Sequence, residues 1–154
     1  MIFLPTAHRA LPELVSRPVP SSTSSRTVTL AVPAKPDYVV LARLALSAVC
    51  RLSPLAPEEV ADLKLAITEA SNYLMGGERR QASREEADGV GTLTFKFDLG
   101  DDALELCVSG DEMPTVSAEE RELSIALIKA TVDAYELDDG MMRLTKQLRF
   151  DDEA

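Results

Sequence analysis

The chain has 154 residues, 45% of them hydrophobic and 27% charged, which is enough for one compact domain and typical of a globular rather than a disordered or membrane protein. Its formal net charge of -10 would repel a phosphate backbone, which argues against direct binding of DNA or RNA. Cys50 and Cys107 lie in apolar runs without a CxxC spacing, so we expect both to be reduced core residues. The only histidine is His8, and we therefore expect no metal site.

The two ends of the chain differ in composition from its middle. Residues 1–25 are rich in proline and serine and are expected to form a flexible tail, and residues 151–154 a short acidic tail. The apolar run at the N-terminus stops at Pro5, before it reaches the length of a signal peptide or membrane span. We therefore expect a cytoplasmic protein with one domain over residues 26–150.

The first half of this domain predicts one strand and two helices. Alternating polar and β-branched residues that end at Pro33 indicate the strand. Asp37 is a candidate N-cap for the first helix, and Pro57 with two following acids suits the first turn of the second. The expected bounds are a strand over 27–32, a helix over 37–52 and a helix from Pro57 to a stop at Gly76-Gly77.

The second half predicts a hairpin, a third helix and a second hairpin. Residues 78–91 are charged, lack an apolar stripe and are expected to form an exposed loop. Ser117 and Glu120 have capping-box spacing, and Asp138-Asp139-Gly140 is a turn sequence. The expected elements are strands over 92–99 and 103–108, a helix from Ser117 to about 133, and strands over 134–137 and 141–150.

The expected order is therefore β-α-α-β-β-α-β-β. Strands joined mostly by hairpins, with helices that must cover one face, predict an α+β fold. We expect a two-layer sandwich in which three helices back a mixed, mostly antiparallel sheet.

Several local phrases, in this order and spacing, resemble a known bacterial family. They are Val32-Pro33-Ala34, Ala42-Arg43, Asp62-Leu-Lys-Leu-Ala-Ile-Thr-Glu-Ala70, Ile125-Ala-Leu-Ile-Lys-Ala130, Val132-Asp133 and Arg143-Leu-Thr-Lys-Gln-Leu148. Over residues 27–149 the chain is similar to the RsbW-type anti-sigma-factor serine kinases of the GHKL ATPase superfamily. The resemblance implies a mixed sheet backed by three helices around an ATP pocket.

In that family the second helix carries a glutamate base and, four residues on, an asparagine that binds the magnesium ion bridging the ATP phosphates. The resemblance makes Glu69 the candidate catalytic base. Tyr73 occupies the asparagine position and is a poor magnesium ligand. Asn72 lies one residue earlier, turned by about 100° around the helix.

The family's two glycine-containing nucleotide motifs are also altered in this chain. An Asp-x-Gly-x-Gly motif corresponds to residues 110–114, where Asp111 could bind adenine only if the strand end slipped by one residue. A Gly-Leu-Gly-Leu turn corresponds to residues 122–125, so Glu122 puts a carboxylate where phosphate would lie and Ser124 replaces a glycine. The resemblance thus implies a degenerate ATP site.

Arg43 matches an arginine that related anti-sigma factors place on the surface shared by sigma factor and antagonist. We expect a regulatory protein that binds a sigma factor, a STAS-type anti-anti-sigma antagonist, or both, without a cofactor. The alternative is an active serine kinase that uses Mg-ATP, with Glu69 as base and Asn72 or Asp111 acting from shifted positions. A third possibility is a related domain with an unrelated partner. Homodimers are an expectation of the resemblance alone.

Overall fold

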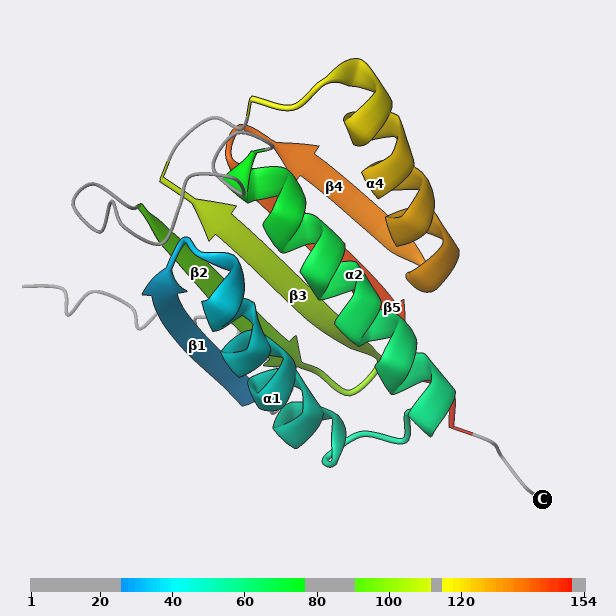
Figure 1. Ribbon diagram of the computed structural model, residues 1–154. Coiled ribbons are helices and arrows are strands. Elements are labelled where there is room, and N and C mark those ends of the chain that lie inside the picture. The colour runs from blue at the N-terminus through cyan, green and yellow to red at the C-terminus, as the bar shows by residue number, and fades with distance from the viewer. Residues whose placement is uncertain (1–25, 77–90, 112–114, 151–154) are drawn as a thin grey trace, which may run out of the picture.

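The computed structural model describes residues 26–76, 91–111 and 115–150 (Figure 1). Its elements are β1 (Arg26–Pro33), η1 (Pro36–Tyr38), α1 (Val39–Cys50), α2 (Pro57–Met75), β2 (Thr92–Leu99), β3 (Ala103–Gly110), α4 (Ala118–Thr131), β4 (Ala134–Asp138) and β5 (Met141–Gln147). This order confirms the predicted α+β class. The two predicted tails and nearly all of the predicted loop over 78–91 lie outside the described residues.

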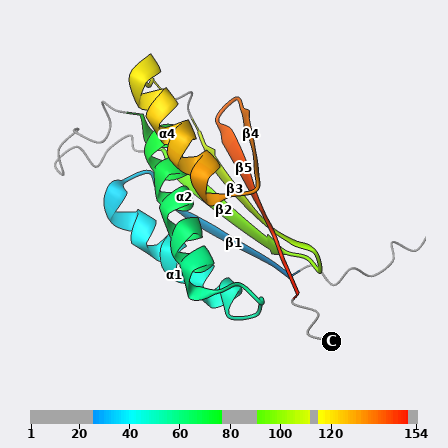
Figure 2. The same cartoon turned by 90° about the vertical axis from the view of Figure 1, so that its right-hand side faces the viewer.

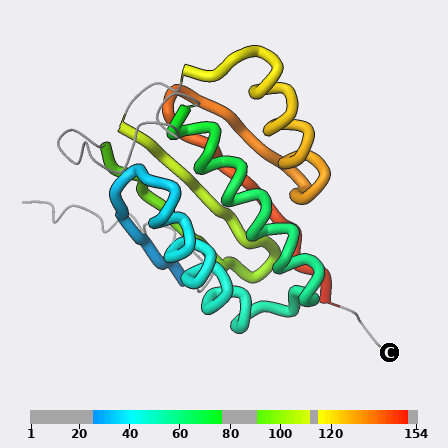
Figure 3. Tube along the Cα trace, in the orientation of Figure 1, coloured from blue at the N-terminus to red at the C-terminus, as the bar shows by residue number. Residues whose placement is uncertain are grey.

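One sheet of five strands forms the first layer, in the order β1-β2-β3-β5-β4. All four neighbouring pairs are antiparallel, so the sheet expected to be mixed has no parallel pair among the strands that the structure describes. The second layer consists of α1, α2 and α4, which lie on one side of the sheet (Figure 2). The Cα trace shows α2 between α1 and α4 (Figure 3).

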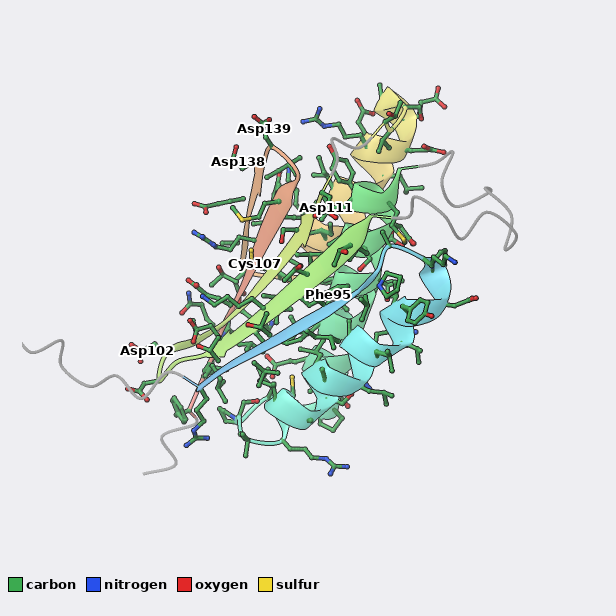
Figure 4. The ribbon with its side chains drawn as sticks, turned by 90° about the vertical axis from the view of Figure 1, so that its left-hand side faces the viewer. Phe95, Asp102, Cys107, Asp111, Asp138 and Asp139 are labelled. Carbon is green, nitrogen blue, oxygen red and sulfur yellow. The ribbon has the colours of Figure 1, made fainter. Side chains whose placement is uncertain are left out.

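The core lies between the helices and the covered face of the sheet. Successive strand residues point to opposite faces, so Leu93, Phe95 and Phe97 of β2 all point inward and are at most 1% exposed. Cys107 of β3 points to the open face and is half-buried, opposite to Phe95 (Figure 4). The prediction that Cys107 is a core residue is therefore wrong, whereas Cys50 is buried in the core.

The first helix is shorter than predicted. The chain forms the 3-10 turn η1 before α1 begins at Val39, so Asp37 lies inside that turn and does not cap the helix. The helix then ends at Cys50, because the carbonyl of Cys50 accepts a hydrogen bond of 3.0 Å from the amide of Ser53 in a following turn.

Later bounds also differ from the prediction by one to three residues. The third helix ends at Thr131 rather than near 133, since the amide of Asp133 already bonds to the carbonyl of Thr145 at 3.0 Å. The last strand ends at Gln147 rather than Phe150. Of the helices in the described part of the chain, none has the length and apolar character that a bilayer span needs.

Candidate functional site

The predicted nucleotide-site residues come from α2, from the end of β3 and from α4. Two of them meet where α4 packs beside α2 over the sheet (Figure 1). The Ser124 hydroxyl lies 3.4 Å from Oε2 of Glu69, a long hydrogen bond in which Ser124 donates. Ser124 is 9% exposed and Glu69 is half-buried, so the carboxylate lies in the seam between the two helices.

Tyr73 lies on the same side of α2 as Glu69, because residues four apart on a helix share a face. Its side chain is 6% exposed. Asn72 is half-buried and turned by about 100° from Tyr73. An aromatic ring, not an amide, therefore occupies the position four residues after Glu69, whereas Asn72, three residues after Glu69, lies on the other flank of the same face. Within the described ranges, no three His, Cys, Asp or Glu side chains cluster as metal ligands would.

The stretch over residues 122–125 lies inside α4 rather than in a loop before it. Ser117 caps the helix by accepting a hydrogen bond of 3.2 Å from the amide of Glu120, as its spacing predicted. The amide of Arg121 already bonds to the carbonyl of Ser117 at 3.0 Å. Amides from residue 122 onward are in the helical ladder, and they are not free to bind an anion. Glu122 itself is exposed.

Asp111 has a structural partner at the end of β3. Its Oδ2 accepts a hydrogen bond of 2.7 Å from the amide of Thr92, the first residue of β2. The amide of Gly110 bonds to the carbonyl of Gly140 at 2.9 Å. Figure 4 places Asp111 at the same end of the sheet as Asp138 and Asp139. The carboxylate thus joins β2 to the end of β3, and among the described residues no hydrogen bond or ion pair links it to Glu69.

Gly76 ends α2 with a backbone conformation that glycine alone adopts readily, at φ 71° and ψ 154°. A Cβ at this residue would lie 3.3 Å from the carbonyl oxygen of Thr115 and 3.4 Å from its amide nitrogen. The backbone just before α4 therefore closes over the end of α2. The sequence identified Gly76 only as a helix stop, because the approach of Thr115 is a contact between distant residues.

Arg43 is exposed on α1, beside several exposed apolar residues. Val40 is 52% exposed, Leu41 43% and Leu44 62%. Along the sequence Val39, Val40, Leu44 and Leu46 form one apolar series, but the structure buries Val39 and Leu46 and places Val40 and Leu44 on the outer surface. The signal was available in the helical period, because the buried residues of α1 recur at three- and four-residue steps that exclude Val40 and Leu44.

Comparison with known proteins agrees with this fold. The family model of the histidine kinase-like ATPase domain matches residues 32–148. The serine-protein kinase RsbW of Listeria innocua is 33% identical over 113 residues, which cover 73% of this chain and 68% of that protein. The serine-protein kinase RsbW of Bacillus mycoides is 26% identical over 110 residues, which cover 71% of this chain and 59% of that protein.

One solved structure shares the fold. The RsbU and RsbW domains of a Mycobacterium tuberculosis protein superpose with a TM-score of 0.56 at 14% identity. The match covers 80% of this chain and 32% of that longer chain. At this identity the likeness concerns the fold.

Proposed function

This chain belongs to the histidine kinase-like ATPase domain family, as a relative of the RsbW serine-protein kinases, and from that premise we propose that it regulates transcription by binding proteins rather than by using ATP. Its partners are a bacterial sigma factor, a STAS-type anti-anti-sigma antagonist, or both. It acts in the cytoplasm, without a cofactor and without contacting nucleic acid.

The observation that carries this proposal is the helical conformation of residues 122–125. A glycine-rich turn binds phosphate through backbone amides that have no other partner. In this chain those amides lie in the hydrogen-bonded ladder of α4. The first turn of α4 adds the carboxylates of Glu119 and Glu120, which would repel a triphosphate.

The residues on α2 also fit a magnesium ion poorly. Magnesium prefers oxygen ligands in octahedral geometry, and the buried ring of Tyr73 occupies the position where an asparagine would supply one. Glu69 is in turn paired with the hydroxyl of Ser124. These contacts support a domain that has kept its core but lost the ligands for Mg-ATP.

The alternative is an active kinase that phosphorylates a serine of a STAS-domain antagonist. The observation in its favour is the retained carboxylate of Glu69, half-buried in the seam between α2 and α4. It requires Glu69 to release Ser124, and either Asp111 to release the amide of Thr92 or Asn72 to act from one residue before the family position.

The partner surface in this proposal is the outer face of α1. Arg43 provides a cation at one edge of this face, Val40 and Leu44 are the exposed apolar residues next to it, and Leu41 lies at the opposite edge. A charged residue within an exposed apolar patch is typical of protein interfaces. The same face could take a second copy of the chain, so homodimers are part of the proposal.

Isothermal titration of the full chain with Mg-ATP and Mg-ADP tests the loss of nucleotide binding. We expect no heat beyond dilution, because the site residues that the structure describes offer the metal and the phosphates no free ligands. Heat of binding at micromolar to sub-millimolar nucleotide would favour the active kinase. In that case Glu69→Gln would keep binding and abolish phosphorylation of the antagonist.

Capture of a purified sigma factor or STAS-domain protein tests the partner surface. We expect Arg43→Ala to weaken capture, and Arg143→Ala, which changes an exposed arginine on the open face of the sheet, to leave it unchanged. Equal capture by wild type and Arg43→Ala would remove Arg43 from the interface. Sedimentation of the same samples reports whether the chain is dimeric.

A further inference from the structure

A second surface feature lies between the C-terminal end of α1 and the first two turns of α2 (Figure 1). It is an open hollow of about 450 Å³, which we call the α1–α2 hollow. Its apolar lining includes Cys50, Leu55 and Val60, and its cations are Arg51 from the end of α1 and Lys64 from α2. None of the predicted site residues belongs to it.

The charge of the α1–α2 hollow is opposite to that of the protein. The chain has 26 acidic and 16 basic residues, yet the lining contains two cations and no carboxylate. Within the described residues, neither Arg51 nor Lys64 forms an ion pair. The neighbouring acid Glu59 is directed elsewhere, since it pairs with Lys146 at 3.5 Å. The hollow therefore presents positive charge without a described counter-ion.

Lys64 and the Cys50 thiol belong to the same lining. Burial raises the pKa of the Cys50 thiol to about 11, and the ammonium group of Lys64 acts in the opposite direction.

The shape of the hollow favours a protein segment as its occupant. Small-molecule sites enclose most of their ligand, whereas this hollow is open to solvent along the helix pair. Two cations beside apolar residues complement a segment that carries carboxylates next to apolar side chains. Arg51 lies eight residues from Arg43, roughly 12 Å along the helix, so the two arginines contact different parts of a partner.

We propose that the α1–α2 hollow binds an acidic segment of a partner protein, with a carboxylate between Arg51 and Lys64 and an apolar side chain over Leu55 and Val60. This inference rests on the proposed protein-binding function. It adds the chemistry of the bound segment and a surface that the family resemblance does not assign.

Backbone amide NMR of the full chain, titrated with a blocked dodecapeptide of leucine, alanine and glutamate, tests the proposal. We expect chemical-shift changes centred on Arg51, Ala61 and Lys64. The same peptide with glutamine for every glutamate is expected to bind about tenfold more weakly, because it cannot pair with the cations. Shifts centred elsewhere, or equal binding of the two peptides, would overturn the proposal.

Charge reversal gives the matched control. The double variant Arg51→Glu/Lys64→Glu is expected to lose about tenfold or more in affinity. The variant Lys96→Glu/Arg143→Glu makes the same change in net charge on the open face of the sheet and is expected to bind normally. Thermal melting checks that both variants fold, and Arg51→Gln/Lys64→Gln replaces the first if it does not. Equal weakening in both would mean that net charge alone attracts the peptide.

A known partner separates the two proposals. If capture of a sigma factor or STAS-domain protein depends on Arg43 but not on Arg51 and Lys64, the hollow is not part of the interface and the proposed function stands. If neither class of partner is captured while the acidic peptide still binds the hollow, the hollow stands and the identity of the proposed partners fails.

Discussion

Replacing Gly76 with alanine is expected to destabilise the domain through the end of α2. The backbone at Gly76 has φ 71° and ψ 154°, a region that is nearly restricted to glycine, and holding another residue there costs about 1–3 kcal/mol. The new Cβ would also lie 3.3 Å from the carbonyl oxygen of Thr115, closer than ordinary van der Waals contact. Both effects raise the free energy of the folded state.

The net cost is smaller than their sum, because alanine also restricts the unfolded chain. That effect stabilises by about 0.4–1 kcal/mol, which leaves a loss of about 2 kcal/mol. With a urea dependence of about 2 kcal/mol per molar, typical for a small domain, the midpoint of unfolding falls by about 1 M.

Urea unfolding followed by circular dichroism measures this shift, and Gly110→Ala is the matched control. Gly110 has no positive φ, and a Cβ there would meet its nearest atom, Cδ2 of Leu93, at 3.6 Å. We expect the control to change stability by less than about 1 kcal/mol. If Gly76→Ala unfolds at the same urea concentration as Gly110→Ala, the close approach of Thr115 does not constrain this residue.

Three further predictions concern packing, capping and titration. Leu46→Ala should lower the free energy of unfolding by about 2–5 kcal/mol in urea, because Leu46 is fully buried. Leu44→Ala changes a residue that is 62% exposed and should lower it by less than about 0.5 kcal/mol. Similar losses in the two variants would contradict the assigned face of α1. Ser117→Ala should cost about 1 kcal/mol through loss of the cap on α4, and an unchanged midpoint would show that the cap contributes nothing. Burial raises the pKa of Cys50 from 9.0 to about 11, so the folded state holds the thiol proton more tightly than the unfolded state. The free energy of unfolding should therefore fall as the pH rises from about 9 to 11. Cys50→Ala should flatten that decline in unfolding free energy, and an equally steep decline in the variant would refute the assignment.

Regular patterns in the sequence predicted most of the secondary structure. Period-two alternation identified β2 and β3 to within two residues, and Asp138-Asp139-Gly140 marked the hairpin between β4 and β5. The predictions that were wrong concern the ends of elements. Asp37 has the chemistry of an N-cap, but the chain forms a 3-10 turn there, and the tail of the predicted last strand leaves the sheet after Gln147.

The candidate site was predicted only as positions along the chain. The spacing of Glu69 and Tyr73 predicts that they share one side of α2, because the helical period is local. Nothing local indicates that Ser124 donates to Glu69, or that Asp111 joins β3 to the amide of Thr92. Each of these contacts joins residues from different elements, and their pairing depends on how the elements pack.

The sequence by itself determined the order of the elements, the α+β class and the family resemblance, because periodicity, turn residues and local phrases depend on neighbours along the chain. The tertiary structure decided that β5 lies between β3 and β4, that Leu44 faces outward while Leu46 is buried, and that Arg51 and Lys64 border one hollow. These arrangements depend on which face of each helix and strand finds a partner, and only the packed sheet and helices settle that choice.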